Sequence, residues 1–236
     1  MKPKLSIVVP CYDEEKNIPL ILDRFKSVIK TKDVELILVD NGSNDNTPQV
    51  LKKLLPKYKF ARSVRVKKNI GYGWGIFSGL KSAKGEFLAW THADMQTDPK
   101  DVITAFTFIK KQENPEMTYV KGRRRERPLF DGAFTLGMSI ATTLLLGKFM
   151  SDINAQPNVF HREFFNLLRK KPPTDFSFDT YAYYLAKKNG YKVVKIPVYF
   201  KKRIHGESHW NVSFGAKWKF IKRTGKFIMM LRREYK

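Results

Sequence analysis

The chain has 236 residues, of which 42% are hydrophobic, so it can bury the core of one α/β domain and is not a disordered tail. Lysine and arginine total 45 against 22 aspartates and glutamates, and this net charge of +23 indicates an anionic partner: nucleic acid, anionic lipid or a phosphorylated small molecule. The single cysteine, Cys11, excludes an intrachain disulfide, and no uninterrupted apolar stretch reaches the roughly 18 to 20 residues that span a bilayer.

Short β-branched runs alternate with helical patterns in the first half of the chain. The predicted strands are Leu5–Val9, Val34–Val39, Ser63–Val66, Glu86–Trp90 and Met117–Val120. Predicted helices lie between them and begin with Asn17 as an N-cap, with Thr47-Pro48, with Trp74 and with Asp98-Pro99. This alternation predicts βαβ units and a mainly parallel sheet. No apolar signal-peptide core precedes the first strand, so secretion is not expected.

The second half is less regular. We expect, in chain order, a basic loop at Arg123–Arg127, a mostly apolar helix at Leu129–Met150, a helix at Phe178–Lys188 closed by Asn189-Gly190, a strand at Lys192–Phe200 and a basic amphipathic helix at Phe214–Arg233. No internal repeat or low-complexity linker divides the chain.

Polar or glycine-rich residues follow the predicted strands. In parallel α/β sheets ligands bind beyond the carboxyl ends of the strands, so these blocks together predict a nucleotide site. They are Pro10–Glu15, Asp40–Thr47, Asn69–Gly75 and His92–Gln96. The first turn lacks G-x-G-x-x-G and no Walker phosphate loop is present, which excludes the usual dinucleotide and P-loop sites. Each block taken alone also fits a simple turn.

The sequence His92-x-Asp94-x-Gln96 fits a divalent metal site. Mg²⁺ and Mn²⁺ prefer oxygen ligands, and one carboxylate combined with diphosphate oxygens commonly suffices. Alternatively, His92 caps the end of a strand and Asp94 is solvated.

The ordered blocks resemble glycosyltransferase family 2, the inverting enzymes with a GT-A fold, and within it the polyprenyl-phosphate and dolichyl-phosphate sugar synthases. The resemblance covers nearly the whole chain and rests on Ser6–Ile18, Val39–Thr47, Asn69–Gly73, Gly85-Glu86, Ala93–Pro99, Gly122-Arg123, Asp152, Gly190-Tyr191, Ile196–Val198 and Arg203-x-x-Gly206-x-Ser208. It implies an α/β GT-A fold with a Rossmann-like, mainly parallel sheet flanked by helices.

The resemblance also implies roles for individual residues. Asp94 and Gln96, with His92 at the first position of the family's D-x-D, would hold Mg²⁺ or Mn²⁺. Arg203 would contact the diphosphate and Arg123 the acceptor phosphate, although in so basic a chain both also fit solvated surface charges. The implied catalytic set is Asp94, Arg123, Asp152 and Arg203. The implied nucleotide-sugar-binding set is Pro10, Tyr12, Glu14, Asp40, Gly42, Ser43, Asn69, Gly71, Asp94, Arg203 and His209.

The sequence departs from the family pattern in three further places. The acceptor-loop motif Ser-Gly-Phe is replaced by Asn154–Asn158, and the family's lysine after Ser208 is His209. The C-terminal membrane spans of many relatives are missing from this sequence. Residues 214–236 form instead the basic amphipathic helix, which either docks on an anionic membrane surface or packs on the core.

The resemblance therefore predicts a metal-dependent glycosyltransferase of the hexosyltransferase type. We expect a GT-A domain over 1–213, with a nucleotide-sugar half at about 1–122 and an acceptor half at about 123–213. The favoured reaction is transfer from a UDP- or GDP-sugar to polyprenyl phosphate, by a cytoplasmic protein that is peripheral on the cytoplasmic face of the membrane and binds no nucleic acid. Two alternatives stay open: transfer to a sugar hydroxyl, which needs a base such as Asp152, Asp175 or Asp179, and nucleic-acid binding.

Overall fold

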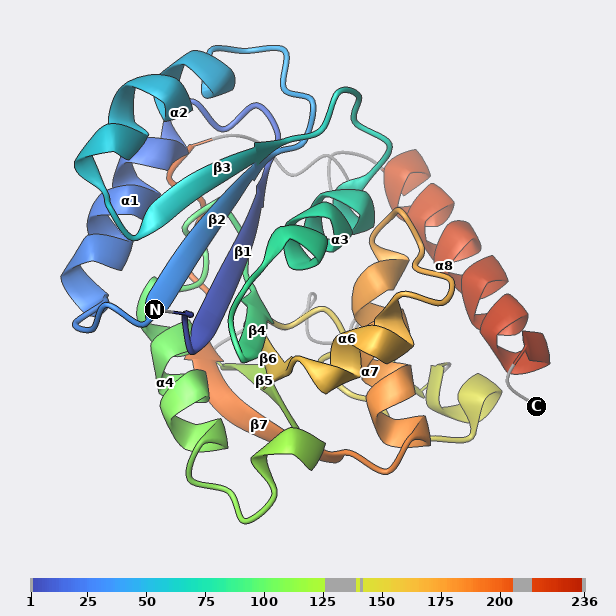
Figure 1. The fold of residues 1–236 in the computed structure, drawn as a ribbon. Coiled ribbons are helices and arrows are strands. Elements are labelled where there is room, and N and C mark those ends of the chain that lie inside the picture. The colour runs from blue at the N-terminus through green and yellow to red at the C-terminus, as the bar shows by residue number, and fades with distance from the viewer. Residues whose placement is uncertain (1, 126–138, 141, 206–213, 235–236) are drawn as a thin grey trace.

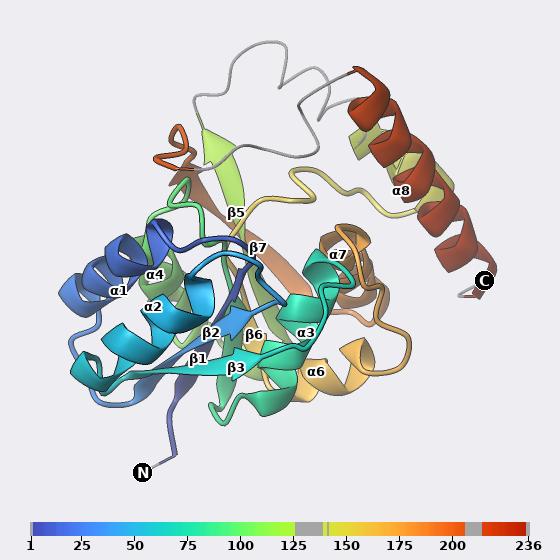
Figure 2. The ribbon, with the colours of Figure 1, turned by 90° about the horizontal axis from the view of Figure 1, so that it is seen from above.

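The computed structural model describes residues 2–125, 139–140, 142–205 and 214–234, without the side chains of 214 and 216–221. In this part of the chain, helices cover both faces of one sheet (Figures 1 and 2). The strands are β1 (Leu5–Cys11), β2 (Val34–Asp40), β3 (Ala61–Arg65), β4 (Phe87–Trp90), β5 (Thr118–Arg125), β6 (Asn158–His161) and β7 (Lys192–Tyr199). The helices are α1 (Asn17–Val28), α2 (Thr47–Leu54), α3 (Tyr72–Ser82), α4 (Pro99–Ile109), α6 (Glu163–Leu168), α7 (Ser177–Lys188) and α8 (Phe214–Glu234), with 3₁₀ turns at Leu55–Lys57 and Pro115–Met117.

The strand order in the sheet is β3-β2-β1-β4-β6-β5-β7. β6 is antiparallel to both of its neighbours, and the other paired strands are parallel. The predicted mainly parallel sheet flanked by helices is therefore confirmed. Since β1, β2 and β4 are adjacent and parallel, their carboxyl ends share one edge.

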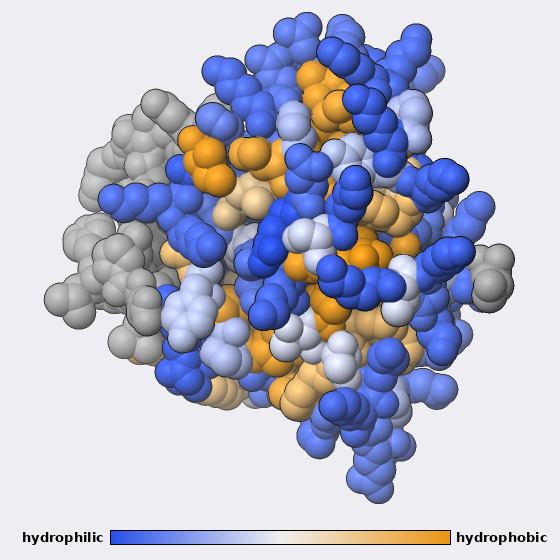
Figure 3. All heavy atoms as spheres, turned by 90° about the vertical axis from the view of Figure 1, so that its left-hand side faces the viewer, coloured by the Kyte–Doolittle hydropathy of each residue, from blue (hydrophilic) through white to orange (hydrophobic). Residues whose placement is uncertain are grey.

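Alternation along the strands divides the core into two layers. In β1, Leu5, Ile7 and Val9 pack with α1 and α4 on one face, whereas Val8 packs with α3 and α7 on the other. Figure 2 shows these two helical layers on either side of the sheet. The outer surface around α1, α2 and α4 is mainly hydrophilic, with smaller apolar areas between the polar side chains (Figure 3).

Two short elements were missed by the sequence prediction. β6 has four residues with polar ends, and α6 has six, too few for a helical period to show. The predicted basic loop is wrong at its start, because Arg123–Arg125 continues β5, paired with Pro197–Tyr199 of β7. Burial of the preceding residues of β5 explains the longer strand, since they must satisfy their main-chain groups within the sheet.

The predicted helix at Leu129–Met150 lies partly outside the described residues. Residues 139–140 and 142–146 are helical, and the turn at Gly147 has a φ of +65°, which favours glycine. Within the described chain, no helix combines the length and the apolar character that crossing a membrane requires.

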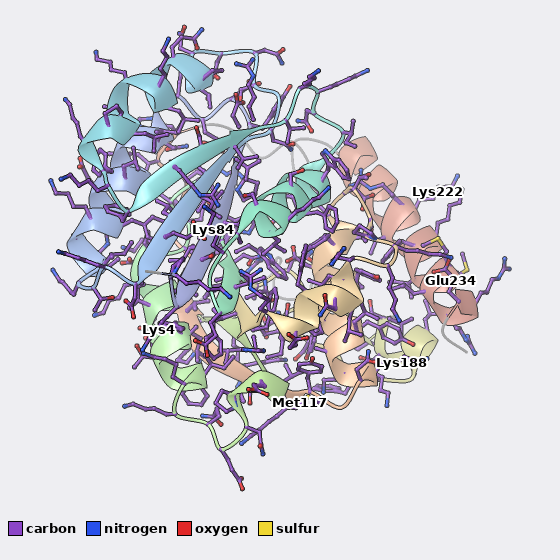
Figure 4. All side chains as sticks on the ribbon, viewed as in Figure 1. Lys4, Lys84, Met117, Lys188, Lys222 and Glu234 are labelled. Atoms are coloured by element: carbon purple, nitrogen blue, oxygen red, sulfur yellow. The ribbon has the colours of Figure 1, made fainter. Side chains whose placement is uncertain are left out.

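α8 packs against the body of the protein through one stripe. Thr224, Ile228 and Leu231 are buried, and the last two belong to the same core cluster as α7. Arg223 pairs with Asp175 at 2.9 Å, and an ion pair between Lys171 and Glu234 fixes the far end. Figure 4 shows Lys222 on the outer side of α8, pointing away from the sheet.

Candidate active site

The loops that follow β1, β2 and β4 meet at one edge of the sheet. Cys11 and Asp40 are partners in the parallel register, and the N–H of Asn41 donates to the carbonyl oxygen of Cys11 at 2.8 Å. On the other side of β1, the N–H of Thr91 donates to the carbonyl oxygen of Val8 at 3.1 Å. The strand pairing thus brings together the blocks that the sequence singled out.

Hydrogen bonds in both directions join the loop after β1 to the loop after β2. The Asp13 carboxylate accepts from the N–H of Asn44 at 2.7 Å, while the N–H of Asp13 donates to the Ser43 hydroxyl at 3.2 Å. Asn44 also donates through Nδ2 to the Tyr12 hydroxyl at 3.0 Å. Asp13 has a left-handed φ of +55°, which turns the chain back toward this partner loop. These hydrogen bonds hold together the loops that carry Tyr12 and Ser43, both of which are predicted to bind the donor.

Glu14, in the loop after β1, is partly buried. Burial raises the pKa of Glu14, and a hydrogen bond from Asn17 opposes that shift. The prediction that Asn17 caps α1 is wrong: Lys16 holds the cap position without a side-chain bond. The Asn17 amide instead donates to Glu14 and, at 3.4 Å, to the carbonyl oxygen of His205, which brings the segment after β7 beside the loop after β1.

Asp40 ends β2 with a carboxylate that is only 2% exposed. Its Oδ1 accepts from the N–H of Ser43 at 3.0 Å. Its Oδ2 lies 3.6 Å from Nε of Arg65 and has no hydrogen bond among the described residues. A buried acceptor without a donor costs free energy, so this oxygen is suited to the N–H of a base or to a ribose hydroxyl.

Glycines let the loop before α3 approach its neighbours closely. Gly42 has a φ of +74°, and a Cβ there would lie 2.5 Å from the main-chain nitrogen of Asn69. Gly71 has a φ of +134°, and a Cβ there would lie 2.3 Å from the carbonyl oxygen of Thr174. Asn41 donates to the carbonyl oxygen of Gly71 at 3.0 Å. Asn69 and Gly71 thus lie against the end of β2.

Asp94, Gln96 and Arg203 form one cluster after β4. Asp94 is 4% exposed, and its Oδ2 pairs with the Arg203 guanidinium at 2.9 Å. Its Oδ1 accepts from the N–H of Gln96 at 3.1 Å, and Gln96 Oε1 accepts from Nε of Arg203 at 3.3 Å. Lys201 and Gln96 also exchange main-chain and side-chain hydrogen bonds, which hold the segment after β7 in place.

His92 points into an aromatic stack. Its ring lies 5.7 Å from that of Tyr72 at 27°, and Tyr72 in turn stacks on Phe176 at 4.8 Å. Burial lowers the pKa of His92, while the charges of Asp94 and Asp179 oppose this shift. The neutral imidazole is thus favoured here.

The side chains around Asp94 can hold a divalent ion only together with a ligand. In the described part of the chain, no group of three or more His, Cys, Asp or Glu side chains is gathered to bind a metal. Asp94 offers one carboxylate, Gln96 one amide oxygen and His92 one imidazole. Such a set fits an Mg²⁺ or Mn²⁺ ion whose remaining ligands are diphosphate oxygens and water.

The residues predicted for the acceptor side are more scattered. Arg123 is exposed near the end of β5, and Asp152 is half-buried with a left-handed φ of +51°. Neither has a hydrogen bond or ion pair with the donor-side cluster in the described residues. His209 lies outside the described residues.

Two of the three carboxylates considered as bases have structural partners. Asp175 accepts from the N–H of Ser177 at 2.8 Å, besides its ion pair with Arg223. Asp179 is buried and accepts from Nε1 of Trp90 at 3.0 Å and from Nε2 of Gln156 at 2.8 Å. Burial raises the pKa of Asp179. These partners leave Asp152 as the carboxylate of the three with the fewest constraints.

Two side chains near this region were not singled out from the sequence, the partly buried Tyr72 and the buried Lys121. Tyr72 accepts a hydrogen bond from Gln156 at 3.2 Å and links that side chain to the His92 stack. Lys121 is 0% exposed within β5. An isolated lysine in an apolar run was the available signal, since lysine is almost never fully buried without partners.

Curated proteins similar to this chain act on polyprenyl phosphates, by their names. The undecaprenyl-phosphate 4-deoxy-4-formamido-L-arabinose transferase of Photorhabdus laumondii is 24% identical over 212 residues, which is 88% of this chain and 63% of that protein. The dodecaprenyl-phosphate galacturonate synthase of Rhizobium johnstonii is 31% identical over 134 residues, 56% of this chain and 38% of that protein. The chain thus spans less than two thirds of the length of these relatives.

Solved structures with the same fold include nucleotide complexes. Glucosyl-3-phosphoglycerate synthase of Mycobacterium tuberculosis, solved with UDP, aligns with a TM-score of 0.73 at 17% identity, covering 98% of this chain and 80% of that one. A mannosyltransferase of Pyrobaculum calidifontis, solved with GDP-Man and Mn²⁺, aligns at 0.67 and 18% identity, covering 100% and 65%. These likenesses confirm the predicted GT-A fold. The profile of Glycosyl transferase family 2 matches residues 6–175, and the chain belongs to that family.

Proposed function

We propose that this chain moves a sugar from a UDP- or GDP-sugar to a polyprenyl-phosphate acceptor at a membrane surface, with inversion at the anomeric carbon. The observation that carries the proposal is the pairing of two features at one sheet edge. Asp40 presents a buried oxygen that has no hydrogen bond among the described residues, and Asp94 is paired with the cationic Arg203. A nucleoside supplies donors for the first, and a diphosphate supplies anionic oxygens for Arg203. The names of the polyprenyl-phosphate relatives favour the lipid acceptor.

The Arg203 guanidinium is central to donor binding. It can bind a diphosphate bidentately, and this would free the Asp94 carboxylate that it now pairs with. Asp94, with Gln96 and His92 nearby, would then hold Mg²⁺ or Mn²⁺ against the same diphosphate. When bound, the ion would neutralise the charge that develops on the departing nucleoside diphosphate.

A polyprenyl phosphate needs no general base, because its oxygen is already an anionic nucleophile. That oxygen attacks the anomeric carbon, the bond from this carbon to the diphosphate oxygen breaks, and the nucleoside diphosphate leaves with the electron pair. We assign the exposed Arg123, near the carboxyl end of β5, to the acceptor phosphate. Arg203 remains with the leaving diphosphate.

A surface on the α8 side of the molecule suits a membrane. Large apolar side chains are exposed there beside lysines and arginines: Ile140, Leu144 and Phe149 before β6, and Met229 and Met230 on α8, with Lys148, Lys222, Lys226, Arg232 and Arg233. Leu144 and Phe149 are 75% and 68% exposed. We call these residues the apolar–basic surface and propose that it docks on anionic lipid, peripherally, on the cytoplasmic face.

The alternative acceptor is a sugar hydroxyl. A hydroxyl must lose its proton during attack, so this reaction requires a base. Asp152 favours this alternative reaction. Its half-buried carboxylate has no hydrogen bond or ion pair among the described residues, so it could accept the proton. The two acceptors predict different products, a glycolipid or a water-soluble glycan.

A donor screen tests the nucleotide half of the proposal. Thermal unfolding of the full chain would be followed with UDP-, GDP- and dTDP-sugars, each with and without Mg²⁺ or Mn²⁺. A donor that binds the folded state raises Tm with increasing concentration, by about 2.7 kcal/mol of stabilisation at 100 times its Kd. We expect one nucleotide to do so more strongly with metal. If no nucleotide shifts Tm at millimolar concentration, the chain does not use a nucleotide-sugar donor.

A further inference from the structure

Three cationic side chains bind five consecutive carbonyl oxygens, those of residues 151–155, here called the 151–155 turn. Lys121 Nζ donates to the carbonyl oxygens of Asp152, of Ile153 at 3.2 Å and of Ala155 at 3.5 Å. Lys195 Nζ donates to that of Ser151 at 3.0 Å, and Arg124 Nη2 to that of Asn154 at 2.6 Å. Adjacent strands, β5 and β7, therefore hold every carbonyl of the turn.

Lys121 is the buried centre of this arrangement. Its side chain is 0% exposed, and no carboxylate among the described residues lies within 4.0 Å of it. A buried ammonium is costly unless its three donors are satisfied, and here three main-chain oxygens satisfy them. An apolar side chain at this strand position would avoid that cost. The lysine is thus explained by the turn that it binds.

The 151–155 turn connects the two halves of the site. It carries Asp152, whose left-handed φ of +51° directs the chain through the turn. The next residue, Gln156, donates to Asp179 and to the hydroxyl of Tyr72. The ring of Tyr72 stacks on that of His92. Gly122 allows this closeness, because a Cβ there would lie 2.0 Å from the carbonyl oxygen of Gln156.

We propose that Lys121 is a positioning residue, which together with Lys195 and Arg124 fixes the 151–155 turn beside the part of β5 that carries Arg123, the residue assigned to the acceptor phosphate. The proposal rests on the proposed function and deepens it. Through these three cations, β5 and β7 shape the loop that leads into β6.

The charge of Lys121 gives this arrangement a pH dependence. The pKa of Lys121 is lowered to about 7, chiefly by burial; the charges of Lys195 and Arg124 also lower it, whereas those of Asp179 and Asp152 oppose the shift. The ring of Tyr183 lies 4.9 Å from Nζ. Above that pH the amine keeps two donors for three carbonyls, so the turn loosens and transfer falls. Stability changes in the opposite direction: the unfolded lysine holds its proton up to about 10.4, so this group favours folding increasingly as pH rises from about 7 to 10.

The first test compares Lys121→Met with Lys192→Met, which removes an exposed lysine of β7 bonded to Gln112. We expect Lys121→Met to lower kcat/KM for undecaprenyl phosphate in detergent micelles at least tenfold. The nucleotide Kd, measured by calorimetry, should stay within twofold. The alkaline limb of the pH–rate profile near 7 should disappear, whereas Lys192→Met should keep wild-type values throughout. If Lys121→Met does not fold, Lys195→Met, at a half-buried position, tests the same prediction, with a smaller expected loss of kcat/KM.

Hydrogen exchange gives a readout that needs no transfer activity. The N–H of Ala155 donates to the carbonyl oxygen of Asp152 at 3.0 Å, so its protection reports on the turn. Protection of residues 150–157 should fall in Lys121→Met or Lys195→Met, while that of β1 and β2 is unchanged. Wild-type protection and wild-type acceptor kinetics in these variants would overturn the proposal. If the variants lose protection but the wild-type chain transfers no sugar to a lipid phosphate, the role of Lys121 in fixing the turn is supported and the proposed function is rejected.

Discussion

Asp94 and Arg203 come from different halves of the chain, yet they make an ion pair of 2.9 Å beside the carboxyl end of β4. This pair joins the loop after β4 to the segment after β7, which Gln96 also holds. In the proposed reaction, a diphosphate that takes the guanidinium would exchange this ion pair for its own and leave the Asp94 carboxylate to a metal ion.

We predict that Asp94→Ala abolishes metal-dependent donor binding and lowers transfer on the order of 10²-fold or more, because the carboxylate is the strongest hard ligand in the cluster. Calorimetry with and without Mn²⁺ measures the binding, and circular dichroism checks the fold. The control is Glu113→Ala, which removes an exposed carboxylate far from the site. Near-normal turnover of folded Asp94→Ala would refute the role.

We predict that Asp40→Asn weakens nucleotide binding about tenfold even without metal. The amide keeps an oxygen for the N–H of Ser43 but replaces the free Oδ2 by a donor, which faces the N–H or hydroxyl of the nucleoside. Titration with the nucleoside diphosphate alone measures this loss. An unchanged affinity would place the nucleoside elsewhere.

The sequence could indicate the donor side of the site but not its pairings. Asp40, Asn69 and Asp94 follow strands, so topology alone gathers them. Arg203 was predicted as a site residue only through the family resemblance, because nothing in a basic chain marks one arginine as the partner of one carboxylate. Lys121 is marked only as an isolated lysine in an apolar run, and its partners could not be predicted, since they are main-chain oxygens that any sequence supplies.

At the scale of elements, the loop before α3 packs closely against the loop before α7. We predict that Gly71→Ala destabilises the protein by at least 2 kcal/mol, because its φ of +134° is strained for alanine and its Cβ would clash with Thr174. Gly190→Ala is the matched control: its φ is +75° but nothing lies within 4 Å of its Cβ, so about 1 kcal/mol is expected. Urea unfolding measures both, and equal losses would mean that the close approach does not matter.

α8 offers a matched pair of changes on opposite faces. Leu231→Ala should cost about 2 to 5 kcal/mol of unfolding free energy, since this side chain is 1% exposed in the core. Met230→Glu, at a side chain that is 42% exposed, should change stability by less than about 0.5 kcal/mol but weaken binding to anionic vesicles. Co-sedimentation at low and high salt measures the second effect. If Met230→Glu binds vesicles as the wild type does, α8 is not part of the docking surface.

Long buried strands and capped helices were predictable, and short or tertiary-dependent elements were not. β1 and β2 are apolar runs, and Asp98 caps α4 by accepting from the N–H of Lys100 at 2.9 Å. β6 depends on its pairing with β4 and β5 rather than on its own sequence. The sequence predicted that α8 is amphipathic, but not what its apolar face contacts. Ile228 and Leu231 of that face are buried in the core, whereas the pattern alone fits a membrane equally well.

At the scale of the whole molecule, the net charge of +23 and the apolar–basic surface belong to one account. Cations near an anionic membrane each contribute on the order of 1 kcal/mol, and salt screens this attraction, whereas insertion of apolar side chains is not screened. A chain that acts on lipid phosphates must bring its acceptor site to the bilayer edge. The charge therefore suits both the diphosphate of the proposed donor and the membrane surface of the proposed acceptor.

The most direct test is transfer of a labelled sugar from the selected donor, with undecaprenyl phosphate in anionic vesicles as the acceptor. The account predicts that label enters the organic phase only when the lipid phosphate and the metal are present, that an equal amount of nucleoside diphosphate is released, and that Asp94→Ala forms no product. Label that stays in the aqueous phase on a glycan, or nucleotide release without a lipid product, would contradict it.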